Sequence, residues 1–451
     1  MKQKQFALAA LVGTCLLTPA GLRAQILRAQ ILPAQIAPTQ TLPTPNQAVP
    51  AAGPEASSPQ ASTPLTLQRA LDIARTTNPT LLAARQHAEA VRQNEVTAGL
   101  RQNPTLTLLG QDVTLAADNP GNPYFYSANV GRLFERGEKR RWRLDSARAT
   151  TAVTESQLRD LERSTMLNVK TSFTQMLLAK EALALSQENL TDFRKTVDLN
   201  KVRLDAGDIS KTDFERIDLQ LAQFESDYDN ARLNLEQAGA SLQLLLGVER
   251  LSPAFDIAGS LDPPAIAITL ANLEKLALNA RPDYAAAQQS VTAAQATARL
   301  AIAQGTADPT ISAEYERSGF DNTFGANIQI PLRIFDKNQG EKARTRYEVE
   351  SANLSLIASR NQVLSDVDQA WASLDIAQSQ SRRYQSHYLQ EAATIRDNLE
   401  FSYRNGSATL LDYLDALHDY RTVNANALNA RAQVWLAIHQ LSYAAATEVV
   451  P

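Results

Sequence analysis

The sequence predicts a mostly helical chain with a smaller β portion that crosses a membrane, built from two copies of one structural unit. Three observations lead to this prediction: an internal repeat, long helical segments without proline or glycine, and short segments of alternating polarity. The chain has 451 residues, of which 44% are hydrophobic and 20% are charged. This composition is typical of a folded protein and is sufficient for a large core.

Composition and motifs exclude several classes of function. The formal net charge is −4, so the chain as a whole has no excess of positive charge that would attract nucleic acid. We therefore expect no nucleic-acid partner. The single cysteine and the four histidines fall in no metal-ligand spacing, which predicts that there is no metal site. The sequence contains no Gly-x-Ser-x-Gly, P-loop or Gly-x-Gly-x-x-Gly motif. We therefore expect a protein that is not an enzyme and needs no cofactor.

Residues 1–24 have the order of a secretory signal peptide: two lysines, an apolar run over residues 6–17, and small residues after it. The apolar run is too short to cross a bilayer comfortably, and no later stretch is apolar enough to cross one as a helix. The chain is therefore predicted to be exported. Cys15 leaves open a lipid-attachment site, although Thr14 stands where bacterial lipoproteins usually carry Gly or Ala.

Residues 25–64 hold 8 of the 20 prolines of the chain. Proline at this density blocks helices and strand ladders. We therefore expect a disordered, extended tether between the signal peptide and the folded body.

The rest of the chain contains a long internal repeat. Four segments of the first half recur in the second half in the same order, at offsets of 199 to 205 residues. They are residues 67–79 with 270–282, 103–106 with 308–311, 137–139 with 340–342, and 206–207 with 405–406. Because this period is much longer than that of a solenoid, it predicts a duplicated domain with repeats at residues 65–260 and 261–451.

Each repeat is predicted to begin with two helices. A short amphipathic helix ends at Asn78-Pro79 in the first repeat and at Arg281-Pro282 in the second, because proline disfavours a helical conformation in the residue before it. An alanine-rich helix follows in each repeat, at residues 80–101 and 283–304.

Two short β segments come next in each repeat and form hairpins at residues 105–134 and 310–334. Residues 326–332 alternate between apolar and polar side chains, which gives that strand one face of each kind. The strands themselves are expected at residues 105–112, 124–134, 310–317 and 322–334.

The longest helices are predicted over about residues 141–204 and 344–403, because neither stretch contains proline or glycine. Each is followed by a turn and then by another helix. In the first repeat, the helix after the turn carries ten apolar positions from Phe214 to Leu245 in alternating steps of three and four. These positions recur 199 residues later. This 3.5-residue period predicts a coiled-coil seam.

Isolated hairpins are only marginally stable in water, so the edges of these strands need partners. Strands of this length and polarity in an exported protein suit a transmembrane β-barrel. Four strands are too few to close a barrel, whereas three chains would supply twelve. The long helices would then continue on one side of the membrane as a helical tube, at about 1.5 Å per residue.

The chain resembles the TolC-like outer-membrane efflux channel family (outer membrane factors), in particular its heavy-metal and multidrug branches. The resemblance covers about residues 65–446 and is carried by the doubled proline breaks, the strand starts Asn103-Pro104 and Asp308-Pro309, and the segment 403–416. It implies a homotrimer with a 12-stranded barrel in the outer membrane of a Gram-negative bacterium and a trimeric α-barrel tunnel in the periplasm. It also implies docking to a periplasmic adaptor (membrane fusion) protein and, through it, to an inner-membrane pump of the RND or ABC type.

By this resemblance the protein would be the outer-membrane channel of a tripartite efflux system, a passive exit duct for small molecules or ions. The alternative is a periplasmic coiled-coil adaptor or scaffold, which normally carries one helical hairpin and so does not match a duplicated chain. The sequence predicts neither the cargo (metal ion, drug, solvent or protein), nor the pump and adaptor, nor the resting state of the gate.

The two turns after the longest helices, at residues 206–210 and 404–408, are the first candidate site. Glycine permits the reversal of the chain there, and the segments can be turns and nothing more. By the resemblance, however, such turns receive the hairpin of the adaptor. The candidate docking residues are Gly207, Asp208, Ile209, Gly406, Ser407 and Ala408.

Asp412 and Asp415 lie three residues apart and hence on one helix face. By the resemblance, these acids form a pore ring, which would favour cations and raise the pKa of some of its members. A solvated acidic face is the alternative. The resemblance also pairs Tyr403 with Asp213 across neighbouring helices as a gate latch, although Ala408 stands where the family pattern sometimes adds an arginine.

A membrane interface is the third candidate site. Residues 137–143 combine basic side chains with Trp142, which fits the headgroup region of a bilayer and contact with outer-membrane lipid. Tyr124 and Tyr126 lie beside a Pro/Gly-rich turn and fit an aromatic girdle. The alternatives are a solvated helix start and a hairpin packed on a soluble core.

Overall fold

The computed structural model describes residues 64–111, 125–248, 255–264 and 268–450. The predicted signal peptide, Cys15, Tyr124 and all but the last residue of the predicted tether lie outside the described residues. Residues 61–451 form one compact unit.

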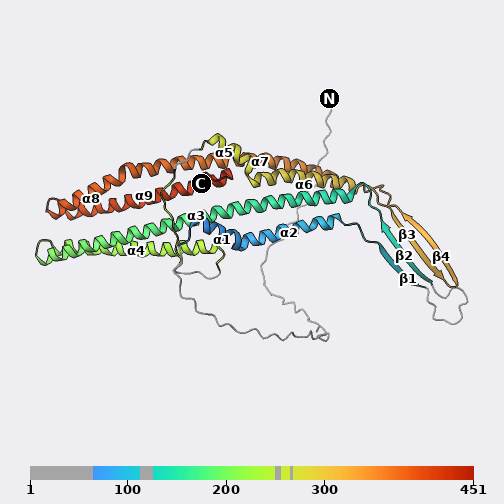
Figure 1. The fold of residues 1–451 in the computed structure, drawn as a ribbon, viewed down its shortest axis with the longest axis horizontal. Coiled ribbons are helices and arrows are strands. Elements are labelled where there is room, and N and C mark those ends of the chain that lie inside the picture. Colours follow the sequence, from blue (N-terminus) through green and yellow to red (C-terminus); the bar gives the residue numbers. More distant parts are fainter. Residues whose placement is uncertain (1–63, 112–124, 249–254, 265–267, 451) are drawn as a thin grey trace, which may run out of the picture. The chain divides into compact units, whose positions relative to one another are not determined.

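The two halves of this unit have the same order of elements (Figure 1). The first half contains α1 (Leu67–Thr77), α2 (Pro79–Gly99), β1 (Thr105–Gln111), β2 (Phe125–Leu133), α3 (Lys139–Asp205) and α4 (Lys211–Leu245). The second half contains α5 (Leu270–Ala280), α6 (Pro282–Gln304), β3 (Thr310–Ser318), β4 (Asp321–Gln329), α7 (Gln339–Arg383), the π-helical turn η1 (Tyr384–Tyr388), α8 (Leu389–Arg404) and α9 (Leu410–Ala445).

The predicted proline breaks are confirmed, and the residue before each proline has a second task. The side chain of Asn78 caps α2: its oxygen accepts a hydrogen bond from the backbone amide of Leu81 (3.1 Å), and its Nδ2 donates to the carbonyl of Leu245 (2.8 Å). Arg281 takes the same place before α6 and donates to the carbonyl of Ala444 (3.3 Å). Leu245 and Ala444 are 199 residues apart, so each break holds the end of the last helix of its own half.

The strands form one antiparallel sheet in the order β1-β2-β3-β4, with Leu106 opposite Val130 and Ile311 opposite Ile328. Because side chains alternate along a strand, one face is mostly apolar and the other mostly polar. The apolar face carries Leu106, Leu108, Tyr126, Val130, Ile311, Tyr315, Phe324 and Ile328. The polar face carries Thr107, Ser127, Asn129, Ser312, Glu314, Thr323 and Asn327.

One strand end was predicted wrongly. The strand expected over residues 322–334 ends at Gln329. Pro331 lacks an amide hydrogen and cannot continue a ladder. The alternating pattern that continues to residue 332 therefore lies partly outside the strand.

The long helices agree with the prediction, with one exception. α3 is continuous over 67 residues, which corresponds to about 100 Å at 1.5 Å per residue. Its counterpart in the second half is interrupted by η1. The sequence predicted an unbroken helix there, because a π turn needs neither proline nor glycine.

The two apolar stripes that predict a coiled-coil seam are covered in the structure. All ten predicted positions of α4, from Phe214 to Leu245, are buried or half-buried, and so are the ten equivalent positions of α9. α4 packs along α3, and α9 packs along α7, η1 and α8. Within the described part of the chain, no helix is long and apolar enough to span a membrane.

Candidate functional site

The two turns at the ends of α3 and α8 depend on glycine. Gly207 and Gly406 have φ angles of 82° and 74°, a region that side chains with a Cβ rarely adopt. After each glycine the chain closes the helix end, where the Asp208 amide donates to the carbonyl of Arg203 (2.8 Å) and the Ser407 amide to that of Ser402 (2.9 Å).

Both turns are open to solvent. The space around each glycine is empty within 4 Å of where a Cβ would lie. Of the six predicted docking residues, four are exposed and two, Ile209 and Ala408, are half-buried. Their role in docking stays a prediction.

Two of the predicted acidic residues, Asp412 and Asp213, bond to the residues that cap the helices after the turns. Asp412 accepts hydrogen bonds from the hydroxyl and the amide of Thr409 (2.6 and 3.0 Å), which lower the pKa of its carboxyl below the usual value. Asp213 accepts from the Ser210 hydroxyl (2.8 Å). Asp415 lies one turn beyond Asp412 and is exposed like it, so the pore ring stays a prediction.

The structure gives Tyr403 a different partner from the predicted one. Its hydroxyl donates to Asn200 of α3 at 2.9 Å, whereas the nearest hydrogen bonds of Asp213 are local. Asn200 is 1% exposed and also donates to the carbonyl of Thr196 (2.8 Å). Burial raises the pKa of Tyr403, with a further contribution from the charge of Asp213, so the hydroxyl stays protonated and able to donate.

Sequence reasoning missed Asn200, although a signal exists. Leu190, Phe193, Val197 and Asn200 follow one another in steps of three and four, so they form one stripe of α3. Asn200 is the polar member of this stripe. A buried polar side chain requires a hydrogen-bond partner, and such a residue is a natural place to look for one.

A second polar contact joins the α3/α4 and α8/α9 hairpins. Arg421 of α9 pairs with Asp227 of α4, and its guanidinium lies over the ring of Phe224 (3.9 Å). Burial lowers the pKa of Arg421. Two polar contacts, Tyr403–Asn200 and Arg421–Asp227, therefore join the α3/α4 hairpin to the α8/α9 hairpin.

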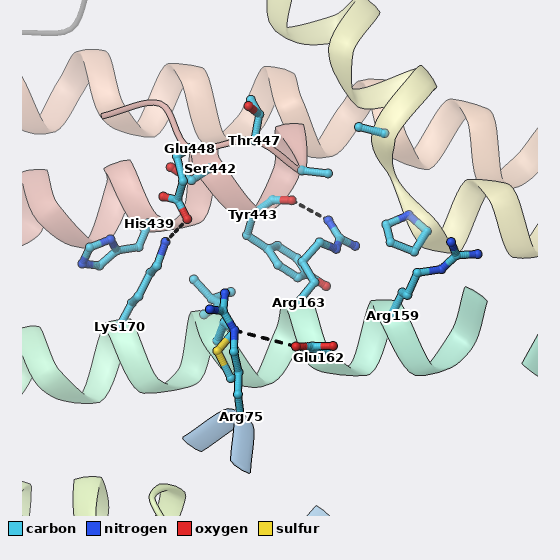
Figure 2. A pocket seen from close by; sticks show the side chains of 15 residues that line it. Arg75, Arg159, Glu162, Arg163, Lys170, His439, Ser442, Tyr443, Thr447 and Glu448 are labelled. Atoms are coloured by element: carbon cyan, nitrogen blue, oxygen red, sulfur yellow. Dashed lines mark hydrogen bonds and ion pairs between the residues drawn. The ribbon is translucent and has the colours of Figure 1, made fainter. Parts of the chain in front are cut away.

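A basic cleft of about 350 Å³ lies further from the turns, between α1, α3, the α5–α6 junction and the end of α9 (Figure 2). Figure 2 shows Lys170 and Glu448 pointing toward each other, and they form an ion pair. Arg163 donates to the carbonyl of Tyr443 and lies over its ring (3.9 Å). The cleft joins the two halves of the chain and was not predicted from the sequence.

His439 lies against this cleft. Its Nε2 is 3.0 Å from the hydroxyl of Thr174. Burial, and then the nearby charge of Lys170, lower the pKa of His439 to about 4. The residue is therefore neutral at physiological pH, and no group of three or more potential metal ligands occurs in the described part of the chain.

The predicted interface residues lie at opposite ends of the sheet. Trp142 is half-buried in the first turn of α3, and the guanidinium groups of Arg141 and Arg299 lie 5.0 and 5.3 Å from its ring. Tyr126 is half-exposed near the start of β2, opposite Gly110.

Comparison with known proteins gives a consistent family. The family described as outer membrane efflux protein matches residues 70–248 and 273–447. The cobalt-zinc-cadmium resistance protein CzcC of Cupriavidus metallidurans is 26% identical over 359 residues, which cover 78% of this chain and 83% of the relative. The outer membrane efflux protein BepC of Brucella suis is 21% identical over 395 residues, 83% of this chain and 84% of the relative.

The fold has solved counterparts. A membrane protein from Pseudomonas aeruginosa superposes with a TM-score of 0.74 at 19% identity, over 84% of this chain and 92% of that chain.

Proposed function

Since the chain belongs to the outer membrane efflux protein family, we propose that it is the outer-membrane channel of a tripartite efflux system. In this proposal three copies form a passive duct that leads small molecules or ions from the periplasm to the exterior of a Gram-negative cell. A periplasmic adaptor and an inner-membrane pump supply the cargo and the energy.

The observation that carries this proposal is the four-stranded sheet with one apolar and one polar face. β1 and β4 are its outer strands, and among the described residues each pairs on one side only. Pairing of β4 with β1 of the next copy would close three sheets into one 12-stranded barrel. The apolar face would then contact lipid and the polar face would line the duct, as in outer-membrane barrels.

The helices support the same ring. α6 packs between α3 and α7, whereas α2 packs against α1 and α3. α2 presents exposed Leu82 and Val96, with exposed Leu100 directly after it. α7 presents exposed Tyr347, Leu354 and Ile357. In a ring of three, α2 of the next copy would cover the free side of α7, as α6 covers its other side.

The turns would then lie at the periplasmic end of the tunnel, where an adaptor reaches them. Asp412 and Asp415 would form the ring of carboxylates that narrows the pore. For the latch, Tyr403–Asn200 and Arg421–Asp227 hold the hairpins together inside one protomer. Asp213 is close enough to Tyr403 to raise its pKa, so it would act beside this contact.

The cargo is proposed from a relative. CzcC is named for cobalt-zinc-cadmium resistance, so divalent ions of these metals are the first cargo to test. A deletion strain should lose zinc tolerance and regain it with the full-length gene. Unchanged tolerance would remove zinc from the cargo and leave the channel proposal intact.

Two measurements test the proposal. The mature protein should fractionate with the outer membrane and have about three protomer masses in detergent by light scattering.

In planar bilayers, Asp412→Asn with Asp415→Asn should reduce the preference for cations, since charged rings set that preference. Asp218→Asn, an exposed acid of α4, is the matched control. A soluble monomer would contradict the channel.

A further inference from the structure

A second basic cavity, of about 340 Å³, lies where the sheet meets the helices. It is bounded by the connection between α2 and β1, the end of β2 and the start of α3. Four of its lining residues are basic, Arg101, Arg132, Lys139 and Arg140, and two are acidic, Glu135 and Glu138.

Both acids of this cavity are already paired with arginines outside its lining. Glu135 accepts from Arg143 at 3.2 Å, and Glu138 accepts from Arg141 at 3.1 Å. Lys139 is likewise committed, because its ammonium group lies 2.6 Å from the carboxylate of Asp308. These pairs leave the other cations of the lining without a counter-charge.

Three guanidinium groups therefore remain for a ligand. Arg101, Arg132 and Arg140 have no carboxylate within 4.0 Å among the residues that the structure describes. Arg140 donates to the carbonyl of Gly99 (2.5 Å), which fixes its position but leaves its charge uncompensated. Arg132 lies 5.3 Å from the ring of Phe134. All three arginines are exposed, as a site open to the surface requires.

The cavity lies directly at the end of the apolar sheet face. Arg132 follows Val130 by two residues on β2, so both side chains lie on that face. Arg132 is opposite Ile311, and Val130 is opposite Leu106. A cationic cavity thus continues an exposed apolar surface without a polar strip between them.

We propose that this cavity binds the phosphate of an anionic glycerophospholipid whose acyl chains lie along the apolar face. The inference rests on the proposed function, because it needs the sheet to be in a membrane. Guanidinium groups match phosphate oxygens in pairs of charge-assisted hydrogen bonds. Free phosphate would meet the same arginines but would gain nothing from the apolar face, so a lipid is the better ligand.

Native mass spectrometry of the detergent-solubilised full-length protein tests this site with three probes. They are dioleoylphosphatidylglycerol, dioleoylglycerol with the same chains and no phosphate, and glycerol 3-phosphate without chains. We expect the first to bind at least about tenfold more tightly than each of the others, because it alone uses both surfaces. Equal binding of the two lipids would overturn the proposal, and tight binding of glycerol 3-phosphate would make the site one for soluble phosphates.

Two double variants separate a site from general attraction by a basic surface. Arg101→Gln with Arg132→Gln should bring the ratio between the two lipids close to one. Arg136→Gln with Arg148→Gln removes the same charge from the connection after β2 and from α3, outside the cavity lining and without unpairing its acids, and it should keep the ratio. Equal losses in both double variants would show a diffuse basic surface and contradict the site.

A lysine double variant and the membrane assay distinguish loss of the site from misfolding and from failed insertion. Arg101→Lys with Arg132→Lys retains charge and should recover part of the ratio, whereas a folding defect would affect the lysine and glutamine variants alike. If the wild type fails to reach the outer membrane, the proposed function fails with this inference. If it reaches the membrane and the ratio is insensitive to Arg101 and Arg132, only the inference fails.

Discussion

Tyr403 and Asn200 join two helical hairpins through a single buried hydrogen bond of 2.9 Å. We expect Tyr403→Phe to leave Asn200 buried without this partner, at a cost of about 1–3 kcal/mol. In the proposed channel this would loosen the periplasmic end and raise the resting conductance in planar bilayers. Tyr388→Phe, in η1 and more exposed, is the control. Equal conductance of both variants and the wild type would remove Tyr403 from the gate.

The partner of Tyr403 shows how far residue-level prediction reached. Periodicity identifies Asn200 as a polar position in a buried stripe, and glycine identifies the turn beyond it. Neither reveals which side chain of a helix 203 residues away faces Asn200, because that depends on how two hairpins pack. Sequence therefore located Tyr403 but assigned its hydroxyl to Asp213, which instead bonds to Ser210.

His439 should make stability depend on pH. Its pKa is about 4 in the folded chain and near 6.5 in the unfolded one. Between these values the unfolded state binds more protons, so stability is complete above pH 6.5 and falls as the pH is lowered toward 4. The difference corresponds to about 3 kcal/mol. Lys170, which opposes a charged imidazole, and Glu448 are the charged groups beside it.

Melting temperatures at pH 7 and pH 5 measure this effect. The wild type should lose stability between them, and His439→Gln should lose less. His418→Gln changes an exposed histidine of the same helix and should keep the wild-type difference. If the loss between pH 7 and pH 5 is the same in all three proteins, His439 does not titrate in this range.

At the scale of elements, period was a better guide than composition. The seam of α4 and α9 was predicted at every position, because ten apolar residues at 3.5-residue spacing leave one way to bury them. The end of β4 and the π turn η1 were not predicted. Pro331 interrupts a ladder that its alternating neighbours suggest, and the residues of η1 are compatible with an ordinary helix, so tertiary packing decides their conformation.

Arg281 is the strongest candidate for an element-joining residue. Its side chain is 3% exposed and reaches Asp283 (2.5 Å) and Asp366 of α7 (2.8 Å), besides the carbonyl of Ala444 at the end of α9. Burial alone would raise the pKa of Asp283, but the hydrogen bond and charge of Arg281 lower it below the usual value. In the first half, Asn78 holds the end of α4 by an uncharged side-chain amide. The corresponding contact in the second half uses the charged side chain of Arg281, so the packing of that half depends more on charge.

Arg281→Met should therefore destabilise the chain by about 3–5 kcal/mol, since it leaves two carboxylates without their buried partner. Circular dichroism during thermal unfolding measures this. Arg194→Met removes an exposed ion pair with Glu225 and should cost at most about 1 kcal/mol. Comparable losses in the two variants would mean that the Arg281 network contributes no more than a surface pair.

At the scale of the whole molecule, the free strand edges predict which residues of neighbouring copies meet. β1 begins and β4 ends at the end of the sheet where the chain enters α3. Thr105 of β1 is opposite Gly131, near the end of β2, and Gln329 of β4 is opposite Thr310, which is opposite Leu133 of β2. If β4 pairs with β1 of the next copy, Thr105 must lie near the end of β4. Neighbouring strands are about 4.8 Å apart, within reach of a disulfide.

Cysteine pairs test this directly in a Cys15→Ser background, which has no other cysteine. Thr105→Cys is combined in turn with Gln329→Cys, Asn327→Cys and Gly325→Cys, which lie on one face of β4 at steps of two. One combination should give, on oxidation, a ladder of species that ends at three protomers, and it reports the register of the new strand pair. Gln111→Cys with Gln329→Cys joins opposite ends of the sheet and should stay monomeric. β1 and β4 have the only free strand edges of the described sheet, so closure must join these two strands. A series of cross-linked species that ends at two protomers would exclude this closure. So would the absence of cross-linked species for every cysteine pair in membrane-inserted protein.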